Sequence, residues 1–442
     1  MPHRSPALIA APPHAAGLLW LTNARLFDAT SDESREDAAV LLKDGVIAEV
    51  GDSSDRCPAG AEVIDLEGRT LMPGLIDIHV HDSGTEPEPL HGAEGLLPGT
   101  PAHFLQAGLR DRLRQGVTTI RVVGSQGIRP QEARQAMRYG AFRGPRLLTC
   151  AKIISATAPG GRFYGDMYRE ADGPDDVRRA VREQIREGAD FVKVMTTGAR
   201  SNELEDPEPV QFTEAELAAL VDEAHRLGYK VAAHAEGIAG CEAAIRHEMD
   251  TIEHGMYLHT RPDLLAQMAS QAQVLVPTLS GYYWMAGLGE VIDPHVAQAA
   301  GEMPEVLVEL AAYNLEQGVL TMRSARDLGV RIALGSDAHT TALEVLRMVH
   351  HGLSPAAALR AGTAVAADAV GLGDKIGTIE EGKLADLVVL DGDVLSSPQL
   401  LADPERVWLV LQLGTAVAGA ALERRIAGQG STPRGMGVGT LA

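Results

Sequence analysis

The sequence predicts an α/β protein with a (β/α)8 TIM barrel at its centre and a small composite β-sandwich domain built from both chain ends. Short apolar segments alternate with helical patterns through the middle of the chain, which is typical of parallel βα units. β-rich stretches flank this region on both sides. Six side chains that could serve as metal ligands lie where five of the predicted central strands end. Because the carboxyl ends of barrel strands meet at one face, these residues predict a metal site there.

The two β-rich ends of the chain have the pattern of short strands joined by tight turns. Before the central region, Lys43-Asp44-Gly45 stands between two apolar runs and predicts a hairpin turn. After it, GKLADLVVLDGD and VWLVLQLGTAVAG repeat this pattern. The predicted units are an N-terminal arm at residues 1–17, a β-domain at 18–72 plus 376–430, a barrel at 73–375, and a Gly-rich flexible tail at 431–442.

Eight strands and the helices between them are expected within the barrel. The strands are predicted at residues 74–80, 117–124, 146–154, 190–196, 230–235, 250–255, 273–279 and 330–336. The helices are predicted at residues 102–115, 131–139, 174–187, 213–227, 237–247, 261–270 and 306–328. Thr213 and Glu216 form the pattern of a capping box, and Gly228 ends that helix.

Composition limits the class of protein. The 442 residues carry a formal net charge of −21, which argues against nucleic acid or an anionic membrane as partner. The three cysteines form neither a disulfide framework nor a CxxC pair, and this indicates a reducing, cytoplasmic location. Prolines interrupt the apolar start of the chain, and no apolar run of about 18 residues follows, so we expect no signal peptide and no membrane span. The expected partners are a small amide substrate and further copies of the chain.

The first predicted strand, LMPGLIDIHVH, places His79 and His81 on one face, because strand side chains alternate. Four imidazoles and a carboxylate at strand ends suit zinc or a similar divalent ion. These candidate ligands are His79, His81, His234, His254 and Asp337, and Lys193 lies in the same pattern.

Lys193 has two interpretations, since a protonated amine cannot bind a metal. It is either a buried ion-pair partner or a carbamate, formed with carbon dioxide, that bridges two ions. Its position between the predicted histidine strands favours the carbamate.

Several motifs together resemble the amidohydrolase superfamily, in its binuclear branch with a carboxylated lysine. Within that branch the chain is similar to the imidazolonepropionase-like hydrolases, which include Xaa-Pro and Xaa-Arg/Lys dipeptidases and ochratoxin-type amidases. The motifs are MPGLIDIHVH, GVTTIRVVG, FVKVMTTG, DEAHRLGYKVAAHAEG, DTIEHGMYL, VPTL, GSDA and GKLADLVVLDGD.

The resemblance implies two divalent ions, expected to be zinc, with manganese, cobalt or iron as alternatives. His79, His81 and Asp337 would hold the first ion, His234 and His254 the second, and carboxylated Lys193 would bridge them. A hydroxide shared by the ions would attack the scissile carbonyl. Asp337 would take the proton of that hydroxide and pass it to the leaving amine. Asp337 and Lys193 are therefore the expected catalytic residues.

Deamination, a different amide substrate and a non-catalytic role are the alternatives to this function. Mononuclear deaminases of the same superfamily place a glutamate three residues after the fifth-strand histidine, whereas Glu236 lies two after His234. The presence of Lys193 also favours hydrolysis of a C–N bond. A dipeptide or N-acyl amino acid is the expected substrate, and an amide, urea or carbamate xenobiotic is the alternative. A non-catalytic scaffold is disfavoured because all six ligand positions are filled.

The predicted substrate-binding residues are Arg162, Tyr164, Glu236 and His339. Arg162 and Tyr164 follow the third strand, where a guanidinium could bind a carboxylate in a bidentate manner. Glu236 stands where the related dipeptidases have a tyrosine, and would bind a substrate cation or orient a metal-bound histidine. Arg200, in the segment after the fourth strand, is expected to be a surface charge.

Overall fold

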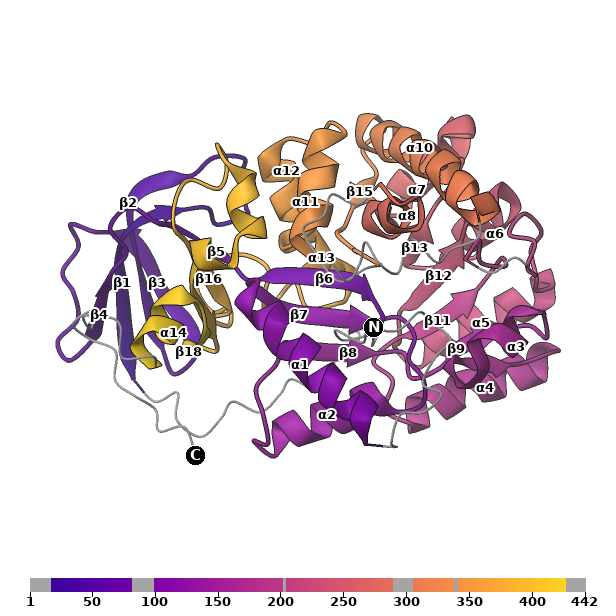
Figure 1. Ribbon diagram of the computed structural model, residues 1–442, viewed down its shortest axis with the longest axis horizontal. Coiled ribbons are helices and arrows are strands. Elements are labelled where there is room, and N and C mark those ends of the chain that lie inside the picture. Colours follow the sequence, from indigo (N-terminus) through magenta and orange to yellow (C-terminus); the bar gives the residue numbers. More distant parts are fainter. Residues whose placement is uncertain (1–16, 82–98, 202–203, 289–304, 338–340, 427–442) are drawn as a thin grey trace.

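The computed structural model describes residues 17–81, 99–201, 204–288, 305–337 and 341–426. An eight-stranded sheet occupies one end of the molecule, and parallel strands surrounded by helices form the larger part (Figure 1). Residues 1–16 of the arm predicted at 1–17, and the whole tail predicted at 431–442, lie outside the described residues. Among the described helices, none is long and apolar enough to cross a membrane.

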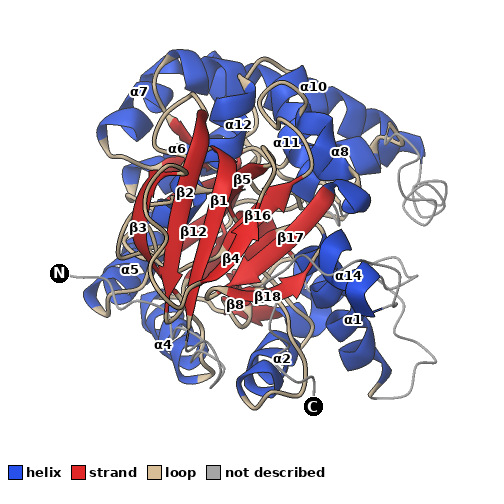
Figure 2. Ribbon diagram, turned by 90° about the vertical axis from the view of Figure 1, so that its left-hand side faces the viewer, coloured by secondary structure: helices blue, strands red, loops and turns tan. Residues whose placement is uncertain are grey.

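The eight-stranded sheet takes strands from both ends of the chain (Figure 2). Antiparallel pairing of β5 with β16 joins the two ends, with Leu71 opposite Val389. The predicted hairpin turn is confirmed, because Lys43 pairs with Val46 around Asp44 and Gly45, which both have positive φ. The division into domains and the second layer of a sandwich stay predictions. The strands are β1 (Leu18–Leu26), β2 (Arg35–Lys43), β3 (Val46–Asp52), β4 (Glu62–Asp65), β5 (Thr70–Pro73), β16 (Leu387–Leu390), β17 (Val407–Gln412) and β18 (Thr415–Ala418).

The remaining strands run parallel in two sheets of three and seven strands. The third predicted strand is divided by the segment around Ala151, which has a positive φ, into β8 and β9. β10 was not predicted. The three-stranded sheet contains β6 (Leu75–Val80), β7 (Val117–Val122) and β8 (Arg146–Thr149). The seven-stranded sheet contains β9 (Ile153–Ser155), β10 (Tyr168–Glu170), β11 (Val192–Met195), β12 (Val231–Ala235), β13 (Thr251–His254), β14 (Val274–Val276) and β15 (Arg331–Ile332).

Helices lie outside these parallel strands (Figures 1 and 2). The predicted capping box is confirmed at α5, where the Thr213 hydroxyl accepts from the Glu216 N–H and Glu216 accepts in return. The helices are α1 (Thr100–Arg114), α2 (Arg129–Arg138), α3 (Gly160–Tyr164), α4 (Pro174–Arg186), α5 (Glu214–Arg226), α6 (Ile238–Arg246), α7 (Pro262–Ser270), α8 (Leu279–Met285), α10 (Glu305–Asp327), α11 (Thr341–His350), α12 (Pro355–Ala361), α13 (Ala364–Ala369) and α14 (Ala420–Ile426). Short 3-10 segments are η1 (Gly165–Met167), η2 (Leu258–Thr260), η3 (Pro398–Ala402) and η4 (Pro404–Arg406).

Backbone hydrogen bonds connect the first parallel strand to the chain that follows the last one. The Ile78 N–H donates to Leu334 O at 3.0 Å, and the Asp337 N–H donates to His79 O at 2.8 Å. The carboxyl end of β6 therefore lies next to the segment after β15.

A buried ion pair ties the parallel strands to the eight-stranded sheet. Arg146 of β8 donates from Nη1 to Asp386 Oδ2 at 2.6 Å, and both side chains are almost fully buried. The other carboxylate oxygen of Asp386 accepts from the Leu413 N–H at 2.9 Å. Removing either charge would leave its partner buried without compensation.

We expect Asp386→Ala to lower the free energy of unfolding by about 3–5 kcal/mol, because the Arg146 guanidinium loses its counter-charge. Glu36→Ala is the matched control, since Glu36 pairs with Arg25 at 2.6 Å on the surface, and it should cost less than about 1 kcal/mol. Denaturant unfolding measures both. Equal small effects would contradict the role given to the buried pair.

Candidate metal centre

Four imidazoles meet at the carboxyl ends of three parallel strands. His79 lies in β6 and His81 directly after it, while His234 lies in β12 and His254 ends β13. The ring centroid of His254 is 5.0 Å from that of His79 and 4.6 Å from that of His234. The rings of His79 and His81 are 5.8 Å apart. The predicted histidines thus form one cluster.

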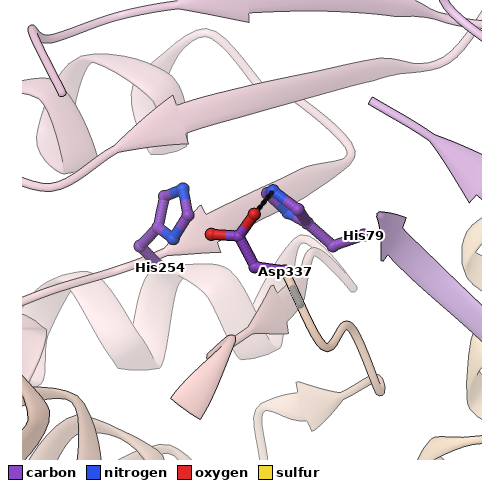
Figure 3. A group of neighbouring side chains, drawn as sticks. All are labelled: His79, His254 and Asp337. Atoms are coloured by element: carbon purple, nitrogen blue, oxygen red, sulfur yellow. Dashed lines mark ion pairs between the residues drawn. The ribbon is translucent and has the colours of Figure 1, made fainter. Parts of the chain in front are cut away.

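Asp337 reaches this histidine cluster from the chain after β15 (Figure 3). Its Oδ1 lies 3.5 Å from His79 Nε2 and 3.3 Å from His81 Nε2. Gly281 of α8 leaves room for it, because a Cβ at that position would lie 3.1 Å from Asp337 Oδ2. Burial opposes ionisation of the carboxyl, but His79 and His81 outweigh it and lower the pKa of Asp337. The carboxylate is therefore the expected form.

Lys193 of β11 is buried, with a relative exposure of 2%. Its Nζ has no hydrogen-bond partner among the described residues. Burial lowers the pKa of Lys193 to about 8, and the nearby negative charge of Glu253 limits the fall. A buried amine that lacks a partner is costly, and it marks a position where a further group would be stabilised.

Each of the four imidazoles uses one ring nitrogen for a contact with the protein. A histidine that binds a metal commonly does this, since the second nitrogen is then fixed toward the ion. The nitrogens left over are Nε2 of three rings and Nδ1 of His234. The contacts are His79 Nδ1 with Glu253 Oε2 at 2.6 Å, His81 Nδ1 with Gly124 O at 3.2 Å, His254 Nδ1 with Thr278 Oγ1 at 2.7 Å, and His234 Nε2 with Gly198 O at 3.2 Å.

Glu253 and Arg121 form a buried charge pair beneath the histidine cluster. This pair was not predicted from the sequence. Arg121 Nη2 donates to Glu253 Oε1 at 2.7 Å, and Thr251 also donates to this oxygen. Burial disfavours the carboxylate, but Arg121 and then His79 outweigh it and hold the pKa of Glu253 well below its usual range. The sequence did contain a signal for this pair, since Arg121 in β7 and Glu253 in β13 are charged residues within otherwise uncharged strands.

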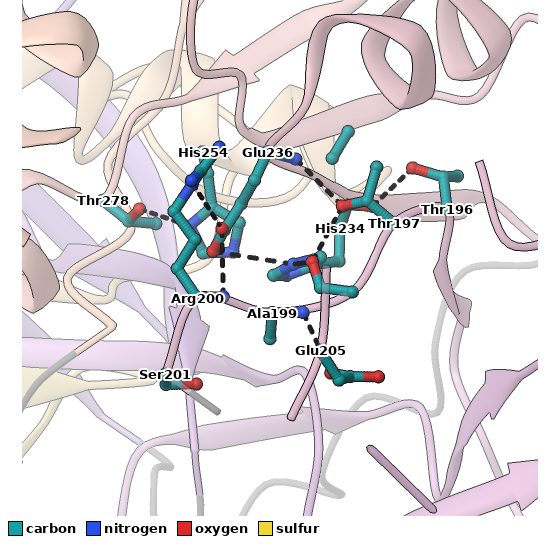
Figure 4. A network of polar contacts seen from close by, with 12 residues as sticks. Thr196, Thr197, Ala199, Arg200, Ser201, Glu205, His234, Glu236, His254 and Thr278 are labelled. Carbon is teal, nitrogen blue, oxygen red and sulfur yellow. Dashed lines mark hydrogen bonds and ion pairs between the residues drawn. The ribbon is translucent and has the colours of Figure 1, made fainter. Parts of the chain in front are cut away.

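Glu236, predicted to bind substrate, is buried beside the cluster (Figure 4). Its Oε1 accepts from Tyr282 Oη at 3.0 Å and lies 3.7 Å from His234 Nε2. Its Oε2 accepts from the Arg200 N–H at 3.1 Å and lies 3.3 Å from Arg200 Nε. Burial raises the pKa of Glu236 to about 7, and Arg200 opposes the rise. The protein itself already uses both carboxylate oxygens of Glu236.

The expectation that Arg200 is a surface charge is wrong. Its side chain is only 8% exposed, and its guanidinium lies over the Tyr257 ring at 5.5 Å and beside Glu236. It lies a few residues after the end of β11, and its position in the sequence did not predict that this segment folds back onto the carboxyl end of β12.

The other predicted substrate residues differ in their surroundings. Arg162 of α3 is exposed. Tyr164 is buried, stacks on Tyr168 at 4.8 Å, and its hydroxyl contacts Ser201 Oγ at 2.6 Å. His339 lies outside the described residues. Contact with the histidine cluster is thus observed for Glu236, whereas the roles of Arg162 and Tyr164 stay predictions.

Two overlapping groups of side chains among the described residues could hold a metal ion. Within each group the possible ligand atoms lie within 4.8 Å of one another. His254 belongs to both groups, so two ions bound there would be neighbours. The groups are His79, His254 and Asp337, and His234, Glu236 and His254.

Known proteins resemble the chain over most of its length. The sequence model of a family described as "Amidohydrolase family" matches residues 70–417. Ochratoxinase of Aspergillus niger is 30% identical over 422 residues, covering 88% of this chain and 85% of that protein. Imidazolonepropionase of Pseudomonas putida is 27% identical over 393 residues, covering 80% and 87%. The crystal structure of a Xaa-Pro dipeptidase with bound methionine in the active site has a TM-score of 0.80 and 26% identity, covering 90% and 99%.

We expect Thr278→Val to lower the affinity for divalent metal by about 10–100-fold, because His254 Nδ1 loses its partner. Thr321→Val is the matched control, since Thr321 contacts His259, which belongs to neither group. Competition with a chelator measures both affinities. Equal affinities in the two variants would show that the Thr278 contact does not orient a metal ligand.

Proposed function

Because the chain belongs to the amidohydrolase family and is a hydrolase acting on carbon–nitrogen bonds, we propose that it cleaves the amide bond of a dipeptide or N-acyl amino acid with two divalent ions. The single observation that carries this proposal is the histidine cluster around Lys193. Four imidazoles there each have one nitrogen held by the protein. The opposite nitrogens are then available for metal.

The spacing of donor atoms supports a metal at this position. Two ligands about 2.1 Å from one tetrahedral ion lie roughly 3.4 Å apart. Asp337 Oδ1 lies 3.5 and 3.3 Å from the Nε2 atoms of His79 and His81. These three residues would hold one ion, and His234 and His254 would hold the other. Imidazole and carboxylate donors suit zinc, which is the metal we propose.

Lys193 is proposed to bridge the two ions as a carbamate. Its buried Nζ lacks a hydrogen-bond partner among the described residues, and its lowered pKa makes the neutral amine accessible. The neutral amine can add to carbon dioxide and release one proton, which gives a carbamate whose two oxygen donors share one negative charge and avoids a costly buried cation. This step converts the residue that fits the cluster least into a metal ligand.

The ions, when bound, would supply a water of near-neutral pKa and polarise the scissile carbonyl. Asp337 is the proposed proton carrier, because its carboxylate borders both His79 and His81 and its pKa is low enough to leave it ionised. Tyr282 lies 6.0 Å from the His254 ring, between centroids, and helps to enclose the site.

We also propose that the two parallel sheets belong to one closed (β/α)8 barrel. β8, an edge strand of the three-stranded sheet, continues through a short segment into β9, which lies next to the edge strand β10 of the seven-stranded sheet. The bonds from Ile78 to Leu334 and from Asp337 to His79 support closure at the opposite edges. A cytoplasmic location and a homo-oligomeric state stay predictions.

The substrate class rests on the relatives. One of them is a dipeptidase with methionine bound in its active site, and methionine carries the free carboxylate of a peptide product. A screen of dipeptides and N-acyl amino acids on zinc-loaded protein tests the proposal. Turnover of several of them would support it, whereas turnover of neutral amides, ureas or carbamates alone would contradict it.

Lys193→Ala should lose metal affinity by at least about 10–100-fold, together with activity, because the proposed bridge is gone. A short carboxylic acid such as acetate should restore part of both. Lys152→Ala is the matched control, since Lys152 pairs with Asp166 near the surface. Metal content by mass spectrometry and turnover are measured. Full metal loading in Lys193→Ala would rule out the carbamate.

Asp337→Asn should keep the fold but lose about 10²-fold or more in kcat, the scale of general acid–base catalysis. The amide keeps the size of the side chain beside Gly281 but cannot carry the proton. Steady-state kinetics measure kcat, and circular dichroism checks the fold. Near-normal kcat across the pH range would exclude this role for Asp337.

A further inference from the structure

We propose that Arg200 binds the free carboxylate of the substrate, and that Glu208 occupies this guanidinium when no substrate is present. The inference rests on the proposed function and names the residue that selects N-acyl amino acids over neutral amides. It replaces the role that the sequence suggested for Arg162.

The carboxylate of Glu236 lies between Arg200 and the histidine cluster. The backbone N–H of Arg200 donates to Glu236 Oε2 at 3.1 Å, and the side-chain Nε of Arg200 lies 3.3 Å from the same oxygen. Glu236 also offers a carboxylate oxygen within 4.8 Å of a ring nitrogen of His234 and of His254, the two residues proposed to hold the second ion. Figure 4 shows Arg200 and Glu236 side by side, next to His234 and His254. A ligand on the guanidinium would therefore reach toward the proposed metal ions.

The guanidinium is fixed in place before any ligand arrives. The Tyr257 ring supports its face at 5.5 Å, and Glu236 Oε2 forms an ion pair with its Nε at 3.3 Å, although this contact is not a hydrogen bond. Tyr282 Oη fixes the other oxygen of Glu236 at 3.0 Å. Because the protein already uses both oxygens of Glu236, this carboxylate serves to position Arg200, and it is poorly placed to bind a substrate cation. A pre-oriented planar guanidinium is well suited to a carboxylate.

Glu208 marks the side of Arg200 that is open to an incoming anion. It forms an ion pair with Arg200 Nη2, and its side chain is 54% exposed. Water reaches the Glu208 carboxylate and weakens this pair, although the Arg200 side chain itself is only 8% exposed. A substrate whose amide also contacts the metal ions could displace Glu208. In the absence of substrate, Glu208 therefore occupies the position of the substrate carboxylate.

Arg162 is the other candidate for binding the substrate carboxylate. It is exposed on α3, and no contact with the histidine cluster is observed for it. Arg200, in contrast, is nine-tenths buried and contacts a residue of the second candidate metal group. Arg162 is therefore the natural control for Arg200.

The test compares N-acetyl-L-methionine with its primary amide on the zinc-loaded parent and three variants. The parent should prefer the free acid. Arg200→Met should reduce that preference in kcat/KM by about 10–100-fold, the loss expected for a charge-assisted hydrogen bond. Glu208→Gln should strengthen the preference by about 2–5-fold, since it removes an exposed competitor. Arg162→Met should leave it unchanged.

Calorimetric binding of L-methionine and its amide gives a second readout that does not depend on turnover, and metal content is checked in every variant. Glu208→Gln leaves the buried pair intact, so it tests the inference even if Arg200→Met folds poorly. A parent without preference, an Arg200→Met variant that keeps it, or a weaker preference in Glu208→Gln would overturn the inference alone. A parent that hydrolyses neither compound, nor any other N-acyl amino acid, would overturn the proposed function and this inference with it.

Discussion

Burial removes water from nearly every ionisable group of the histidine cluster, and much of the surrounding structure compensates for that cost. Burial and the neighbouring Lys193 lower the pKa of His234 to about 3, so its imidazole is neutral, which is the form that binds metal. Glu253 and Arg121 form a buried charge pair beneath the cluster. Lys193 Nζ, in contrast, has no hydrogen-bond partner among the described residues. As a carbamate, Lys193 would become an anionic ligand whose charge is compensated by the two ions.

The histidine cluster was predictable because strand periodicity and strand ends restrict where side chains can lie. His79, His81, His234 and His254 follow that rule, and they meet as expected. The residues that hold and surround them were not predictable in the same way. Glu253 contacts His79 across the sheets, and Arg200 reaches Glu236 only because the segment after β11 folds back. Such contacts depend on tertiary geometry, which a local sequence pattern does not predict.

The fold shows the same division between local pattern and tertiary contact. Apolar runs predicted the positions of the parallel strands, and turn chemistry predicted the hairpin at Asp44 and Gly45. The break between β8 and β9 was missed, since the positive φ of Ala151 has no sequence signature. The tie between Arg146 and Asp386 was also missed, because an ion pair between distant segments is set by packing.

The proposed carbamate of Lys193 between two metal ions is tested most directly by carbon-13 NMR of metal-free protein reconstituted with zinc and ¹³C-labelled bicarbonate. We expect a single carbamate resonance, of intensity equal to one carbon per chain, that appears together with binding of two zinc ions. Binding of two zinc ions without any carbamate resonance, or a carbamate resonance of the same intensity in Lys193→Ala, would contradict it.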